Sequence, residues 1–206
     1  MLGIDIAQVF ILFTVLLFSL TVHEMAHAWT ADRLGDPTAR MLGRVSLNPM
    51  VHADLIGTVV FPLVAMTTGA PLIGWAKPVP VNTSRLRHPR RDFMIVAAAG
   101  PLSNLAQAVI GAVLFRLLAG SGSPVAAEVL LDVMRINVLL AFFNLIPIPP
   151  LDGGNVLAGL LPAAGASMLD RLRPYGFILL YALMFTGLLG DLIIPPSRLF
   201  LGVLLP

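Results

Sequence analysis

Long apolar runs are the feature that most restricts how this 206-residue chain can fold. Residues 7–34, 91–119, 128–146 and 174–194 each form such a run, and about 20 apolar residues are enough to cross a bilayer as a helix. Only 12% of the residues are charged, whereas a soluble domain has about 25%. We therefore predict an all-α polytopic membrane protein with about four to six membrane segments, forming one integral membrane domain over residues 1–206.

The segment between the first two of these long runs follows a different pattern. Residues 54–69 are apolar but short for a full crossing, and residues 70–82 are rich in proline and alternate toward their end. Basic residues lie before residue 54 and again from Lys77 onward, and an excess of Lys and Arg marks the cytoplasmic side of a membrane protein. Residues 54–82 are therefore expected to enter and leave on the same side, as a short helix followed by an extended re-entrant strand.

The same charge bias predicts the orientation of the chain. No basic residue precedes the first run, and Arg33, Arg40 and Arg44 follow it, so the N-terminus is expected outside and residues 33–53 inside. The net charge of +2 is small, and the basic residues fit contact with the lipid bilayer better than binding of nucleic acid. The chain has no cysteine, which excludes disulfides and thiolate metal ligands.

Three ionisable residues occur near the end of the first apolar run, in the sequence HEMAH at residues 23–27. His23 and His27 are four residues apart and share one helix face, so their imidazole nitrogens can bind a single metal ion. Glu24 is placed to act as a general base toward a water molecule beside that ion. The alternative is a pair of interfacial histidines, but ionisable groups inside a membrane are costly and usually serve a function.

A catalytic zinc site usually has three protein ligands, so the histidine pair requires a third. The candidates are Asp54, Asp92, Asp152, His52 and His88. Depth favours Asp152, because His23 lies about 25 Å along the first helix and Asp152 follows Arg135 by a comparable 17 residues from the same face. The two glycines after Asp152 permit a tight turn. The alternative role of Asp152 is that of a cap for a helix over residues 155–161.

Two asparagines in the apolar runs are further candidates. Asn144 lies eight residues before Asp152 and could donate a hydrogen bond to the substrate backbone or to the oxyanion. An amide that packs between helices is an equally good interpretation of Asn144. Asn104 fits a role in packing or in an interhelical hydrogen bond better.

Five stretches together make the chain similar to a known family. They are HEMAH, LGRVSLNP, GWAKPVPVN, AAAGPLSN and NLIPIPPLDGG, and they span residues 23–155. This set resembles the site-2 protease family of intramembrane zinc metalloproteases, in particular small bacterial-type members without PDZ or CBS domains. The resemblance implies one Zn²⁺ per chain held by His23, His27 and Asp152, with Glu24 as the catalytic base. It also implies cleavage of transmembrane protein substrates in the bacterial inner membrane, with the active site toward the cytoplasm.

The resemblance also suggests how a substrate is held, because a helix has to unwind locally before its carbonyls are accessible. Residues 72–82 could bind the unwound segment by strand addition, with Trp75, Lys77 and Val79 as candidate substrate-binding residues. The rival hypotheses are a metal transporter or sensor that uses the same ligands and a non-catalytic protein that binds client helices. A transporter would be expected to show an internal repeat or polar groups along several helices. The sequence indicates neither an oligomeric state nor a regulatory partner.

Overall fold

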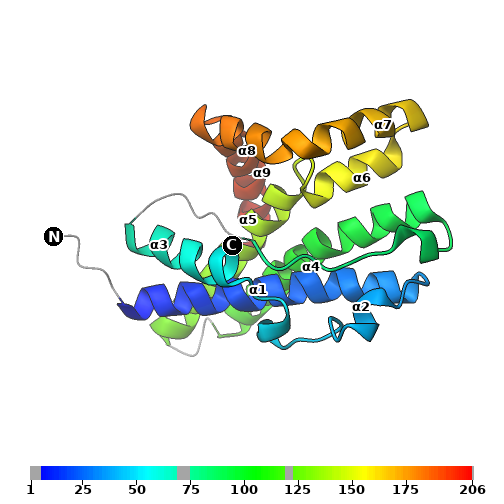
Figure 1. The fold of residues 1–206 in the computed structure, drawn as a ribbon. Helices are drawn as coiled ribbons and strands as arrows, with labels where there is room; N and C mark the ends of the chain where they lie inside the picture. Colours follow the sequence, from blue (N-terminus) through cyan, green and yellow to red (C-terminus); the bar gives the residue numbers. More distant parts are fainter. Residues whose placement is uncertain (1–5, 69–74, 119–122, 206) are drawn as a thin grey trace.

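The chain folds into a bundle of helices, in a computed structural model that describes residues 6–68, 75–118 and 123–205. The α-helices are α1 (Ile6–Arg33), α2 (Thr38–Met41), α3 (Phe61–Thr68), α4 (Pro89–Leu118), α5 (Pro124–Asn144), α6 (Asp152–Leu160), α7 (Ala163–Leu172), α8 (Gly176–Phe185) and α9 (Leu188–Leu204). Shorter helical turns are η1 (Pro49–Val51), the π-helical η2 (Leu55–Val60), η3 (Thr83–Arg85) and η4 (Arg173–Tyr175). Helix α4 is central, because it packs against α1, α5 and α6 (Figure 1).

Apolar side chains of α1 and α5 form a hydrophobic core cluster. Leu16 and Leu20 of α1 are buried against Ile136 of α5, and Ala76 from the segment after α3 joins the same cluster. Ala76 therefore anchors its segment to the bundle by burial of apolar surface. This contact brings residues from the middle of the chain over the face of α1.

The lengths of the helices confirm an integral membrane protein. Helices α1 and α4 are long and apolar enough to cross a membrane, and the bent pair of Ala163–Phe185 with Leu188–Leu204 would make a third span. Within the described residues this is fewer than the four to six segments that we expected. Helix α5 has 21 residues but contains Glu128, Asp132 and Arg135, which weaken it as a span by composition.

The short helix expected at residues 54–69 is confirmed, since η2 and α3 together occupy Leu55–Thr68. The Asp54 side chain caps this helix by accepting hydrogen bonds from the N–H groups of Ile56 and Gly57, at 3.0 and 2.7 Å. Such a cap satisfies donors at the helix start that would otherwise lack partners.

The prediction of an extended re-entrant strand is wrong for residues 75–82, because no strand occurs in the part of the chain that the structure describes. The backbone N–H groups of Trp75 and Lys77 donate to the carbonyls of Gly57 and His52, at 3.0 and 2.8 Å. These acceptors belong to a helix and a turn, so no ladder forms. Pro78 and Pro80 have no N–H to donate. The rest of the predicted strand, residues 70–74, lies outside the described residues.

The single helix expected at residues 174–194 is also wrong. The chain bends by 78° between α8 and α9, and Gly187 has a φ of 80° at the bend. Glycine adopts this left-handed backbone without the steric cost that other residues carry. The apolar pattern continues on both sides of the bend, so hydropathy alone could not locate it.

Candidate metal centre

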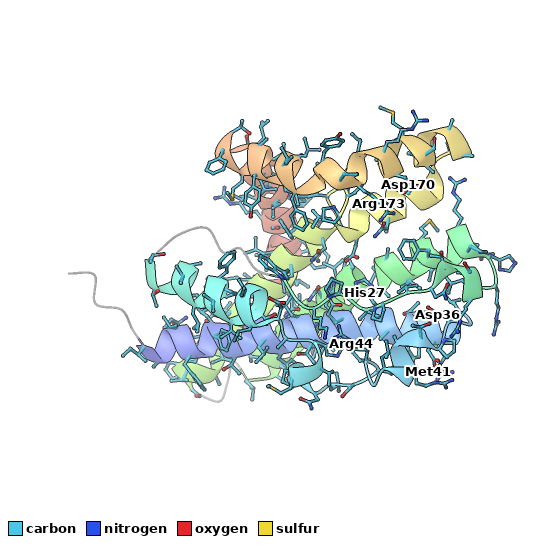
Figure 2. All side chains as sticks on the ribbon, viewed as in Figure 1. His27, Asp36, Met41, Arg44, Asp170 and Arg173 are labelled. Atoms are coloured by element: carbon cyan, nitrogen blue, oxygen red, sulfur yellow. The ribbon has the colours of Figure 1, made fainter. Side chains whose placement is uncertain are left out.

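Two imidazoles of α1 and one carboxylate of α6 meet between α1 and α4. His23 Nε2 lies 3.1 Å from His27 Nε2, and Asp152 Oδ2 lies 3.1 Å from the first and 3.3 Å from the second. Both histidines are buried, and Asp152 is half-buried. Figure 2 shows His27 on α1 where it faces α4. The structure thus brings together the three residues that the sequence proposed as ligands.

The other nitrogen of each imidazole has its own partner. His23 Nδ1 lies 2.5 Å from Asn104 Oδ1, and His27 Nδ1 lies 2.7 Å from the carbonyl oxygen of Val96. Because both partners are oxygen acceptors, each Nδ1 carries the proton and each Nε2 presents a lone pair to the centre. The histidines are therefore oriented as metal ligands by contacts with α4.

The hydrogen bond to Asn104 is part of a longer buried network. Asn104 Nδ2 donates to Asn137 Oδ1 at 2.8 Å, and Asn137 Nδ2 donates to Ser19 Oγ at 2.9 Å. These three side chains are at most 1% exposed and join α1, α4 and α5. The role of Asn104 as an interhelical hydrogen-bond residue is confirmed. Sequence reasoning missed Asn137 and Ser19, although a polar residue inside an apolar run is a signal for such a role.

Asp152 reaches the histidines because α6 begins close to the turn that precedes it. A Cβ at Gly153 would lie 2.3 Å from the carbonyl oxygen of Leu145, and one at Gly154 would lie 2.6 Å from the nitrogen of Pro149. Only glycine permits this approach. The helix cap is Leu151, with no side-chain cap, so the alternative interpretation of Asp152 as a cap is wrong.

The three ligand atoms fit a zinc ion. Tetrahedral zinc with bonds of about 2.0–2.1 Å has ligands about 3.4 Å apart, which is close to the observed separations of 3.1–3.3 Å. Gly100 of α4 borders the same space, since a Cβ there would lie 2.4 Å from His27 Nε2 and 2.5 Å from His23 Nε2. A side chain at position 100 would therefore occupy the centre, so glycine keeps it open.

Glu24 lies next to His23 and is half-buried. Its Oε2 accepts a hydrogen bond from the backbone N–H of Val79 at 3.2 Å. The carboxylate is thus held from the segment after α3, and it is not among the three ligand groups.

The remaining candidates from the sequence have other roles or positions. The Asp92 carboxylate accepts from the N–H of His88 at 2.8 Å at the start of α4, and His52 Nε2 lies 2.8 Å from the carbonyl of Ser46. Asn144 donates to the carbonyl of Leu140 in its own helix at 2.9 Å. Hence Asp54, Asp92, His52 and His88 are not in the ligand cluster.

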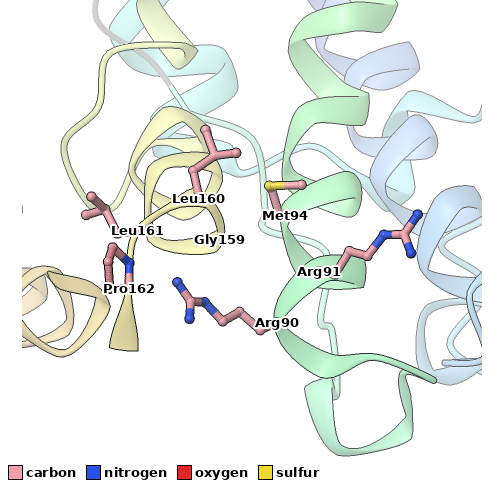
Figure 3. A pocket seen from close by; sticks show the side chains of 7 residues that line it. All are labelled: Arg90, Arg91, Met94, Gly159, Leu160, Leu161 and Pro162. Atoms are coloured by element: carbon pink, nitrogen blue, oxygen red, sulfur yellow. The ribbon is translucent and has the colours of Figure 1, made fainter. Parts of the chain in front are cut away.

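A separate pocket of about 520 Å³ lies between the start of α4 and the end of α6. Arg90 reaches across it and donates to the carbonyl of Ala158 at 3.0 Å, whereas Arg91 points away (Figure 3). This pocket is at the opposite end of α6 from Asp152, so it is not part of the metal centre.

The fold and the site define an integral membrane protein with a buried His-His-Asp metal-binding group. The chain belongs to peptidase family M50, which matches its residues 11–134 and 122–186, and this is the site-2 protease family. The expected family and the assignment as a zinc metalloprotease are confirmed.

Curated relatives support the same assignment. The chain is 35% identical over 188 residues to the "Putative zinc metalloprotease YwhC" of Bacillus subtilis, a match that covers 88% of this chain and 82% of the relative. It is 31% identical to the "Putative zinc metalloprotease Rip2" of Mycolicibacterium smegmatis, over 84% of this chain and 66% of the relative. The protein of the same name from Mycobacterium tuberculosis is 33% identical over 66% of this chain and 52% of its own length. No solved structure gives a significant match.

Proposed function

We propose that this protein is an intramembrane zinc endopeptidase that cleaves transmembrane segments of membrane proteins. The observation that carries the proposal is the depth of the His-His-Asp cluster. His23 lies 17 residues after Ile6, the first residue of α1, or about 25 Å along a helix that rises 1.5 Å per residue. Ten residues, or about 15 Å, separate His23 from Arg33 at the other end of α1, so the cluster lies within the candidate membrane span, where a membrane-embedded peptide can reach it.

The residues fit one Zn²⁺ per chain, held by His23, His27 and Asp152. When bound, zinc supplies Lewis-acid polarisation of the scissile carbonyl and acidifies water. Glu24 then takes a proton from the attacking water and passes it to the leaving amine. The contacts of the two Nδ1 atoms keep the imidazoles from rotating away, so that the chain holds its ligands preorganised.

The substrate would lie against the outer side of residues 75–82. The backbone N–H groups of Trp75, Lys77 and Val79 are already used within the chain, so strand addition through them is not part of the proposal. The side chains of Trp75 and Lys77 are exposed and can contact an unwound segment. Asn144, the last residue of α5, stays a candidate for binding the substrate backbone. We further propose one protease domain over residues 1–206, with its active site toward the cytoplasm.

A comparison of membrane proteomes tests this function. Cells that express the wild-type protein are compared with cells that express Glu24→Gln, and peptides are mapped by mass spectrometry for new termini. We expect fragments with termini inside transmembrane segments only with the wild type, and accumulation of the intact substrates with the variant. Identical proteomes, or cleavage confined to soluble domains, would contradict intramembrane proteolysis.

A further inference from the structure

Residues 75–82, here called the strap, are tied to the rest of the protein along their length. At its near end, the carbonyl of Trp75 accepts a hydrogen bond from Thr58 Oγ1 at 2.7 Å. At its far end the N–H of Asn82 donates to Asp36 Oδ2 at 2.6 Å, and Asp36 is fully buried. The strap is therefore a fixed part of the site wall, although it has no regular secondary structure.

Arg44 holds the middle of the strap. Its guanidinium group is buried, with 6% of the residue exposed. It donates to the carbonyls of Val51 and Lys77, and to that of Pro78 at 3.2 Å. In the described part of the chain no carboxylate lies within ion-pair distance of Arg44. A buried cation is costly unless its donors are satisfied. Here carbonyls of the strap and of η1 accept from both Nη atoms of Arg44, whereas its Nε has no partner.

Val79 is the next residue after Lys77 and Pro78, whose carbonyls Arg44 binds. Pro78 and Pro80 flank it, and proline has no backbone N–H. Val79 therefore carries the single N–H of residues 78–80, and it points at Glu24 Oε2, 3.2 Å away. A residue before proline is also restricted to extended conformations, which limits how far this N–H can turn.

We propose that the Val79 N–H and the Arg44 side chain are the positioning elements for Glu24. A carboxylate has two oxygens that can accept hydrogen bonds. With Oε2 held by Val79, the other oxygen of Glu24 is left to face the substrate water. Arg44 acts one step further away: it binds the carbonyl of Pro78, which shares a planar peptide group with the Val79 N–H, and the carbonyl of Lys77 in the preceding peptide. This inference rests on the proposed role of Glu24 as general base.

Hydrogen exchange measured by mass spectrometry tests the contact without any substrate. In peptides that span the strap, the deuterium difference between the wild type and Val79→Pro isolates the amide of Val79. We expect this amide to exchange at least about tenfold faster in Glu24→Ala and in Arg44→Lys, since lysine cannot bridge several carbonyls as a guanidinium does. The exposed His88→Ala and Arg40→Lys variants are controls and should match the wild type. Equal exchange in Glu24→Ala and the wild type would overturn the proposal.

Kinetics in liposomes then separates positioning from substrate binding. The probe is a single-span substrate obtained from the proteome comparison. Val79→Ala keeps the N–H and Val79→Pro removes it, so we expect kcat to fall about tenfold further in Val79→Pro, with KM and zinc content unchanged. An equal kcat in the two variants, or a change confined to KM, would contradict the proposal. Full activity in Glu24→Gln would instead contradict the underlying general-base role.

Discussion

A Glu24→Gln variant is expected to bind zinc as the wild type does and to lose cleavage by about 10²–10⁴-fold in kcat, the usual contribution of a general base. Glutamine has the same shape and still offers an oxygen to the N–H of Val79, which donates to Glu24 at 3.2 Å. Its amide cannot take a proton from water at neutral pH. The measurement is kcat on a reconstituted single-span substrate, together with zinc per chain by mass spectrometry.

The matched control for this variant is Glu128→Gln on α5. Glu128 is exposed and its change also removes one negative charge, so cleavage should stay near the wild-type rate. Near-normal turnover in Glu24→Gln would contradict the role of Glu24 as general base, whereas no cleavage by the wild type would favour a transporter, a sensor or a helix-binding role for the metal site.

Asp152→Asn is expected to lower zinc affinity by at least about 100-fold. Loss of a single hydrogen-bond partner of a metal ligand typically costs about 10–100-fold, and here the ligand itself loses its charge. Asparagine keeps the size of the side chain, so the close packing of Gly153 and Gly154 beneath it is undisturbed. Competition with a zinc chelator of known affinity measures the change.

Asp54→Asn provides the contrast. Asp54 caps η2, and asparagine caps about as well as aspartate, so zinc affinity and stability should both stay unchanged. Zinc binding by Asp152→Asn that equals that of Asp54→Asn would remove Asp152 from the site.

The sequence predicted those parts of the fold that depend on hydropathy and spacing. The runs at 7–34 and 91–119 lie within two residues of the observed bounds of α1 and α4, because each is apolar, long and ended by polar residues. The four-residue spacing of His23 and His27 and the depth of Asp152 favoured the three residues that cluster in the structure, and the family resemblance implied the same set. Each of these signals depends on the spacing of residues along the chain, so it can be recognised in the sequence.

Other features depend on contacts between distant segments, which no local pattern records. The sequence of the strap alternates like that of a strand. Its backbone N–H groups, however, donate to Gly57, His52 and Glu24 and not to a neighbouring strand. The network through Asn137 exists only because α1, α4 and α5 meet at one level. After the bend at Gly187, α9 packs against α5, which is distant in sequence.

The chain has four histidines, and replacing each of them in turn by alanine tests the metal centre most directly. Zinc per chain is measured on the purified proteins by mass spectrometry. We predict about one zinc per chain in the wild type, the same in His52→Ala and His88→Ala, and loss of most of the zinc in His23→Ala and in His27→Ala. Full zinc content in both His23→Ala and His27→Ala, or equal loss in His88→Ala, would contradict a zinc centre at this site.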